Sequence, residues 1–305
     1  MSDSDAYAAF RAVRFAENGG EPFCPYCGCD AIYEYASRRI FKCKACERQF
    51  SLTSGTLFAS RKLALRDILF AIAMFVNGAN GHSALRMGRD LNVSYKTAFV
   101  LLHKLREAMG AMRTREKLTG VVEIDGVWVG GHIQKTNLVK NRRDRRGTSP
   151  KRRSIVTLRE RRAGGRTLTI VCKHEKDAIP FIRAHVDVSA KIVADEAAHW
   201  GILQTAFELK QINHSKTGFS WGGVHTNWVE SFNSRVRRLE KGVYNHISER
   251  TAAYANETSW REDHRRHSNG DQFRLLLGAA ARLSVSTEWR GYWQRRRAKG
   301  PALPA

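Results

Sequence analysis

The sequence lacks a long apolar segment. Its longest uninterrupted apolar run covers the nine residues 68–76, whereas a helix that spans a membrane needs about 20. The first nine residues are polar and acidic instead of basic and then apolar, so no secretory signal opens the chain. We therefore expect a soluble, cytoplasmic protein without a membrane partner.

Acidic residues are also scarce. The chain of 305 residues has 29 Asp and Glu against 52 Lys and Arg, which gives a net charge of +23 and a pI near 10.3. An excess of this size favours a polyanionic partner, with nucleic acid ahead of a membrane surface. Hydrophobic residues make up 42%, enough for a sizeable core and for two or three small modules. The alternative of a merely soluble basic protein is less favoured.

Cysteine is limited to six residues, but four of them form a pattern. Two C-x2-C pairs are separated by fifteen residues, a spacing typical of a four-thiolate zinc site. Bulky residues alternate between the pairs, which predicts short strands. We expect a zinc ribbon that holds one structural Zn²⁺, while Cys29 and Cys172 act as small apolar residues. The predicted ligands are Cys24, Cys27, Cys43 and Cys46.

The next segment is predicted to be helical. Leucine, isoleucine and phenylalanine recur at helical spacing from residue 63 to residue 75, and a break at 77–81 separates a second helix over 82–90. A turn at 92–93 then leads to a third helix that Ser94 can cap. This pattern predicts a helix-turn-helix-like DNA reader, and an ordinary helical pair is about equally compatible with it. The expected base-reading residues are Ser94, Tyr95, Lys96 and Thr97.

From residue 121 the pattern changes to apolar strands alternating with helices. Strands are predicted at 121–129, 154–160, 167–172 and 190–195, with helices at 178–185, 225–239 and 247–265. This order predicts an α/β fold. We divide the chain into an N-terminal helix (1–20), the ribbon (21–55), the helix-turn-helix-like region (61–115), a catalytic domain (120–270) and a basic C-terminal tail (271–305) whose end frays.

A basic segment interrupts the strands. Residues 140–153 carry eight cations in fourteen positions, which cannot pack in a core and predict a mobile loop. We expect the loop to order on DNA phosphates, and a solvated linker is the less favoured alternative. The cations proposed to contact DNA are Arg142, Arg143, Arg145, Arg146, Lys151, Arg152 and Arg153.

Three acidic residues are candidates for a catalytic site. Asp125 and Asp195 each follow an apolar strand segment, and Glu230 lies in the predicted helix 225–239. Together they are suited to hold two Mg²⁺ or Mn²⁺ ions for phosphodiester chemistry, although either aspartate alone is more typical of a loop or a helix cap. Arg237 follows Glu230 by two helical turns and would therefore share its face.

These residues lie in segments that resemble a known family. The chain resembles bacterial insertion-sequence transposases of the DDE type that carry an N-terminal zinc ribbon. The matching segments are the cysteine module 24–46, EIDGVWVGG (123–131), IVADEAAH (192–199), INHS (212–215), HTNWVESFNSRVRR (225–238) and GVYNHIS (242–248). The resemblance implies an RNase H-like catalytic core and Mg²⁺-dependent cleavage and joining of DNA.

The resemblance also assigns roles by position. Asp125 and Asp195 match the first two acids of the family, and the third catalytic residue is either Asn227 or Glu230. We favour Glu230, because the family pattern has a basic residue after the third acid, and Arg237 stands at that position relative to Glu230. Two residues depart from the family pattern: Asn233 stands where an aromatic residue is common, and Arg237 where lysine is common.

The working hypothesis is a transposase that binds terminal inverted repeats in double-stranded DNA, frees a 3′-OH by hydrolysis and joins it to a target strand. It would act in the cytoplasm in association with the nucleoid, and joining two ends makes a homo-oligomer on DNA the expected form. A non-catalytic regulator with a zinc ribbon and a helix-turn-helix, an inactive transposase copy and a simple nuclease are the alternatives.

Overall fold

The computed structural model describes residues 1–131, 151–212, 225–245, 247 and 250–294. The chain divides into two compact units. Unit 1 combines residues 1–112 with the C-terminal segment from 267 onward, and unit 2 comprises residues 113–266. Unit 2 is thus inserted in the sequence of unit 1.

The cysteine module forms a small antiparallel sheet in the order β1-β2-β3. The rings of Phe41 and Phe50, on neighbouring strands, lie 5.2 Å apart, and Phe41 also packs edge-on against Phe15, just after helix α1. So few apolar side chains cannot stabilise three short strands alone, which fits the expected need for a metal. The elements are α1 (Asp3–Arg14), β1 (Ile32–Tyr35), β2 (Ile40–Cys43) and β3 (Gln49–Phe50).

Two of the following helices meet at a tight turn. Helix α4 begins after Ser94, whose side chain accepts the amide hydrogen of Thr97. Asn92 in the turn adopts a positive φ of 51°. A Cβ on Gly88 would lie 3.0 Å from the carbonyl oxygen of Val93, so the turn approaches α3 closely. The helices are α2 (Leu65–Asn77), α3 (Ala84–Asp90) and α4 (Tyr95–Ala111), so the three predicted helices are present, and a role in reading DNA stays a prediction.

The segment predicted as a basic tail contains a packed helix. Helix α9 (Asn269–Arg282) buries Leu276 and Leu277 within unit 1. Further along, the ring of Trp289 stacks on His103 of α4 at 4.4 Å, and Tyr292 stacks on Phe99. The tail prediction was therefore wrong up to residue 294, because apolar residues between the cations dock this segment on α4. Residues 295–305 lie outside the described part of the chain.

Unit 2 is built on a five-stranded mixed sheet in the order β6-β5-β4-β7-β8. Strands β4, β5 and β6 pair antiparallel, whereas β4, β7 and β8 pair parallel. The predicted α/β fold class is confirmed. The strands are β4 (Val121–Val129), β5 (Arg153–Glu160), β6 (Thr167–Cys172), β7 (Lys191–Asp195) and β8 (Glu208–Ile212).

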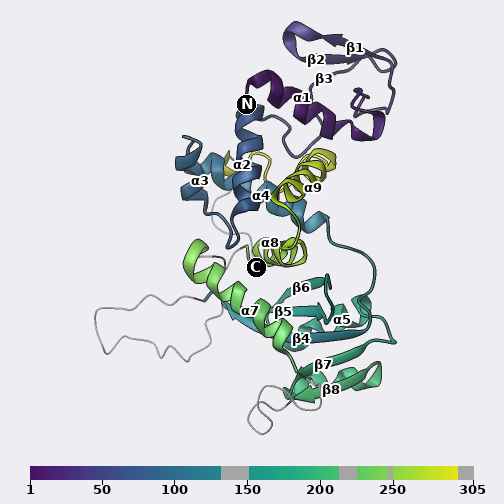
Figure 1. The fold of residues 1–305 in the computed structure, drawn as a ribbon, viewed down its shortest axis with the longest axis vertical. Coiled ribbons are helices and arrows are strands. Elements are labelled where there is room, and N and C mark those ends of the chain that lie inside the picture. Colours follow the sequence, from purple (N-terminus) through teal and green to yellow (C-terminus); the bar gives the residue numbers. More distant parts are fainter. Residues whose placement is uncertain (132–150, 213–224, 246, 248–249, 295–305) are drawn as a thin grey trace, which may run out of the picture. The chain divides into compact units, whose positions relative to one another are not determined.

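Helices cover both faces of this sheet. Even-numbered residues of β4 such as Val122 and Ile124 pack with Ile182 of helix α5. Odd-numbered residues such as Val127 and Val129 pack against helices α7 and α8. Figure 1 shows α7 lying across the sheet. The helices are α5 (Ile179–His185), α7 (Asn227–Leu239) and α8 (Thr251–His264).

Most elements predicted for this unit are present. The four predicted strands and three predicted helices match β4 to β7, α5, α7 and α8 within a few residues. Strand β8 was not predicted. Of the basic loop, Arg142, Arg143, Arg145 and Arg146 fall in the range 132–150, outside the described residues. No helix of the described chain is long and apolar enough to cross a membrane.

Candidate functional site

The four predicted zinc ligands converge. The Sγ atoms of Cys24, Cys27, Cys43 and Cys46 all lie within 4.8 Å of one another. The Cys24–Cys46 and Cys27–Cys43 sulfur pairs are each 3.6 Å apart, close to the ~3.8 Å separation of sulfurs on a tetrahedron with Zn–S bonds of about 2.3 Å. The amide hydrogens of Cys46 and Ala45 and the neighbouring thiol groups lower the pKa of Cys43 to about 6, whereas hydrogen bonds with the other three thiols raise the pKa of Cys27. The cluster fits one Zn²⁺.

Asp125 and Asp195 lie side by side on parallel strands. Ile124 pairs with Ala194 across β4 and β7, so the next residue on each strand is one of the two aspartates. Asp195 ends β7, as predicted. Asp125 does not end its strand but lies in the middle of β4, because β5 continues to pair with β4 as far as Val129. Both carboxylates face the side of the sheet that α7 covers.

Burial and like charge perturb Asp125. Its Oδ1 accepts the amide hydrogen of Gly126 at 2.7 Å, and its Oδ2 accepts the Asn233 side-chain amide at 2.8 Å. Burial and the charges of Asp195 and Glu175 raise the pKa of Asp125, the hydrogen bonds from Gly126 and Asn233 lower it, and the net result is a pKa of about 6. A divalent cation would relieve this repulsion between neighbouring carboxylates.

Helix α7 presents the two candidates for the third residue differently. Glu230 is half-buried and accepts a hydrogen bond from the Thr226 hydroxyl at 2.6 Å, whereas Asn227 is exposed. With 100° of rotation per residue, Glu230 lies about 60° around the helix axis from Asn233, and Asn227 about 120°. Since Asn233 contacts Asp125, Glu230 is on the side nearer to the aspartates. Arg237 is exposed in the last turn of α7.

The carboxylate oxygens of Asp125, Asp195 and Glu230 do not lie as close to one another as the four cysteine sulfurs do. Within the described ranges, the cysteine cluster is the one group of three or more His, Cys, Asp or Glu residues with ligand atoms close enough to share an ion. Asp125 and Asp195 are adjacent through the sheet register, and Glu230 lies on the helix whose Asn233 bonds Asp125.

A carboxylate that the sequence did not reveal fixes α7 on β4. Glu123 is fully buried, and its Oε2 accepts the amide hydrogens of Trp228 and Val229 at 2.9 and 3.0 Å. Its Oε1 binds Arg161 at 2.7 Å. Thr226, the residue before α7, provides no side-chain cap, and the charged Glu123 from β4 satisfies the same donors.

A second unpredicted carboxylate approaches β4 from the opposite side of the sheet. Glu175 accepts a hydrogen bond from Ser154 at 3.1 Å and lies 3.5 Å from the Nε2 of His199. A Cβ on Gly126 would lie 2.2 Å from its Oε1, so the end of the Glu175 side chain lies directly against the backbone next to Asp125. The sequence indicated the contact between Glu175 and His199 only through His199, which ends the family segment IVADEAAH four residues after Asp195.

The predicted DNA-contacting residues that the structure describes lie on surfaces. At the start of α4, Ser94 and Lys96 are exposed, and Tyr95 is 49% exposed. The Lys96 ammonium lies 5.5 Å from the centre of the Trp293 ring. In unit 2, the guanidinium of Arg152 lies 5.3 Å from the centre of the Trp128 ring. Thr97 follows at the first turn of α4, and Lys151 and Arg153 flank Arg152 where β5 begins.

Comparisons with known proteins agree with this arrangement. Residues 117–263 match the ISXO2-like transposase domain, and residues 1–49 match the transposase zinc-ribbon domain. The chain is also 27% identical over 234 residues to an uncharacterized protein in transposable element ISH50 from Halobacterium salinarum, covering 71% of this chain and 76% of that protein. No solved structure matches. Because both modules match in the expected order, the predicted resemblance to insertion-sequence transposases of the DDE type with an N-terminal zinc ribbon is confirmed.

Proposed function

We propose that the protein is a DNA transposase that binds the ends of its mobile element and performs metal-dependent strand cleavage and strand transfer. The observation that carries this proposal is the placement of Asp125 beside Asp195 under a helix that bears Glu230. The order of the strands in the sheet also supports an RNase H-like core. If the five strands β4 to β8 are numbered 1 to 5 along the chain, their order in the sheet is 3-2-1-4-5, and strand 2 is antiparallel to both of its neighbours.

In this proposal Asp125, Asp195 and Glu230 would hold two Mg²⁺ or Mn²⁺ ions, which would supply an activated nucleophile and neutralise the leaving oxygen. Asp125 is held by two hydrogen bonds, so its carboxylate keeps one direction during the reaction. Arg237 contacts the phosphodiester from the exposed face of α7. A freed 3′-OH then attacks the target strand at the same carboxylates.

Glu230 is proposed as the third ligand in preference to Asn227. It is half-buried, it lies closer around the helix to the Asp125 contact, and its charge suits a hard cation. Asn227 is exposed and uncharged. Glu230→Gln should therefore abolish cleavage, whereas Asn227→Ala should retain most of it.

End recognition is proposed for unit 1. The first residues of α4 would enter the major groove, and the basic ribbon would contact the DNA backbone. Two bound ends require at least two active sites, so the proposed active form is a homo-oligomer assembled on double-stranded DNA in the cytoplasm, in association with the nucleoid.

The test uses the purified full chain, Mg²⁺ and DNA from the borders of its own element. We expect nicks at the 3′ ends and joined products, both lost in Asp125→Asn while end binding persists. Glu196→Gln, a change at an exposed acid next to Asp195, is the matched control and should retain activity. Binding without nicks would indicate a regulator or an inactive copy, and nicks without joined products would indicate a nuclease.

A further inference from the structure

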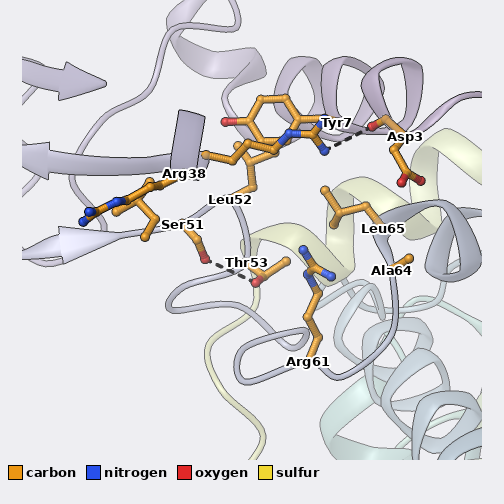
Figure 2. A pocket seen from close by; sticks show the side chains of 11 residues that line it. Asp3, Tyr7, Arg38, Ser51, Leu52, Thr53, Arg61, Ala64 and Leu65 are labelled. Atoms are coloured by element: carbon orange, nitrogen blue, oxygen red, sulfur yellow. Dashed lines mark hydrogen bonds between the residues drawn. The ribbon is translucent and has the colours of Figure 1, made fainter. Parts of the chain in front are cut away.

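Unit 1 contains a cavity of about 320 Å³ between α1, the ribbon and the segment that leads into α2. Three arginines, Arg38, Arg39 and Arg61, line it against a single acidic residue, Asp3. The remaining polar groups include the hydroxyls of two further lining residues, Ser51 and Thr53. Figure 2 shows the Arg61 side chain extending from its segment toward the side of the cavity where Ser51 and Thr53 lie.

The positive charge of this cavity is not balanced from within the protein. Among the described residues, none of the three arginines forms an ion pair with a carboxylate. Arg39 lies over the Tyr7 ring at 5.0 Å and donates only to the backbone carbonyl of Asp3. Burial and the positive charge of Arg39 lower the pKa of Arg61. Arg39 and Arg61 therefore lie near each other without a paired carboxylate among the described residues, an arrangement that an anion completes.

We propose that this arginine cavity binds a phosphate group of the DNA backbone. Guanidinium groups match phosphate oxygens with paired donors, and neighbouring hydroxyls add further hydrogen bonds of the kind found at backbone contacts. DNA is favoured over a free nucleotide because the cavity joins the ribbon to the helix that leads into the helix-turn-helix-like pair. Such a contact is independent of sequence and does not require the protein to be catalytically active.

The test measures the salt dependence of DNA binding by fluorescence anisotropy, with both an element-end duplex and a random duplex. Arg61→Gln should weaken binding of both and reduce the slope of log K against log salt by about 0.9, the value for one lost phosphate contact. The Arg39→Gln/Arg61→Gln double variant should weaken binding further without reducing the slope by more than about 0.9, because only one phosphate contact is lost. Arg66→Gln, outside the cavity and next to Asp67, is the control and should match wild type.

Wild-type affinity and slope in Arg61→Gln and in the double variant would overturn the proposal. A second arm titrates dATP and pyrophosphate in the absence of DNA. If these bind through the arginines while the variants keep wild-type DNA affinity, the cavity is a nucleotide site and the DNA assignment fails. The random duplex keeps this test separate from the proposed function, which fails instead if element ends are neither preferred nor cut.

A different observation, a buried chain of hydrogen bonds, carries a second inference. The Thr157 hydroxyl donates to the Oδ1 of Asn233 at 3.4 Å, and the Asn233 Nδ2 donates to the Oδ2 of Asp125 at 2.8 Å. Thr157 lies directly opposite Asp125 in the pairing of β5 with β4. Thr157 and Asn233 are 0% and 1% exposed, so water does not compete for these bonds.

We infer that Asn233 is a positioning residue that sets the direction of the Asp125 carboxylate. The Thr157 hydroxyl satisfies the carbonyl end of the amide, so the amino end faces Asp125. Together with the Gly126 amide hydrogen, this fixes both carboxylate oxygens and leaves their outer lone pairs for a cation. The inference rests on the proposed function, because it concerns the metal site of that reaction. It also gives a role to Asn233, which departs from the aromatic residue common in the family.

Thr157→Val tests this inference with little change in shape. Without the hydroxyl, the amide carbonyl loses its donor and Asn233 is free to turn. We expect the Mg²⁺ concentration for half-maximal cleavage to rise about tenfold, at the lower end of the range for groups that orient metal ligands, with the KM for DNA unchanged. Thr157→Ser should restore the wild-type Mg²⁺ requirement. Thr169→Val is the control, since Thr169 pairs with Thr157 across the sheet but bonds Ser259.

An unchanged Mg²⁺ requirement in Thr157→Val, or an equal shift in Thr169→Val, would overturn the positioning role. Thermal melts of the three variants identify any that fail to fold, and Asn233→Leu then provides the second measurement, with the same expected rise. If the wild-type protein shows no Mg²⁺-dependent cleavage, the proposed function fails and not this inference alone.

Discussion

Glu123 offers the sharpest test of how unit 2 is held together. Its carboxylate is fully buried and binds the first amide hydrogens of α7 together with Arg161. Glu123→Gln removes the charge, so Arg161 loses its ion pair and the helix loses an anionic cap. Breaking a buried pair by removing one partner costs about 3–5 kcal/mol, and losing a helix cap costs about 1 kcal/mol. Because the two effects share one carboxylate, we expect a total of about 3 kcal/mol.

The assay is thermal unfolding of the full chain, followed by fluorescence and far-UV circular dichroism. For a unit of this size, about 3 kcal/mol corresponds to a fall in Tm of roughly 6–12 °C. Glu196→Gln, which removes an exposed acid next to Asp195, should leave the Tm of unit 2 unchanged. A Tm for Glu123→Gln within about 2 °C of wild type would show that this carboxylate does not anchor α7, since the estimate predicts three times that shift or more.

Three further predictions concern zinc, pH and a glycine. Chelation of zinc should unfold the ribbon and leave unit 2 folded, seen as a loss of DNA affinity without a change in the melting of unit 2. Burial raises the pKa of Glu160, but hydrogen bonds from Arg166 and its neighbours outweigh it and hold the pKa at about 2, below the usual 4.5. The stability it contributes is therefore present above pH 4.5 and is lost as pH falls toward 2; Glu160→Gln should remove that part of the acid dependence of urea unfolding. Gly126→Ala should push Glu175 away from Ser154 and lower stability by about 1–3 kcal/mol, and an unchanged urea midpoint would contradict the close approach seen here.

The elements that the sequence predicted correctly are those with strong apolar periodicity. Strand β4 and helix α2 bury most of their apolar residues, so the pattern of burial follows the pattern of residue types. Strand β8 was missed because it lies at the edge of the sheet and only Ile212 is fully buried in it. Helix α9 was missed because the C-terminal segment is rich in charged residues, so the short apolar stretch with Leu276 and Leu277 was not recognised as a buried helix face.

The candidate site was predictable only in part. The adjacency of Asp125 and Asp195 follows from the parallel pairing of β4 with β7, and the sequence indicates both strands by their apolar residues. The roles of Glu123, Asn233 and Glu175 depend on how α7 and the segment before α5 pack on β4. Such contacts join residues about 50 to 110 positions apart, and no local pattern marks them. Asn233 departs from the aromatic residue that is common in the family, and only its hydrogen bond to Asp125 gives this departure a structural reason.

The insertion of unit 2 within unit 1 has a consequence for biosynthesis. A ribosome completes residues 1–112 and the whole of unit 2 before it delivers α9, although α9 packs with α1, α2 and α4. Until then residues 1–112 expose the apolar surface that Leu276, Leu277 and Ala280 later cover. A messenger that ends after the codon for residue 266 would therefore yield a polypeptide in which unit 2 is complete and residues 1–112 are prone to aggregation.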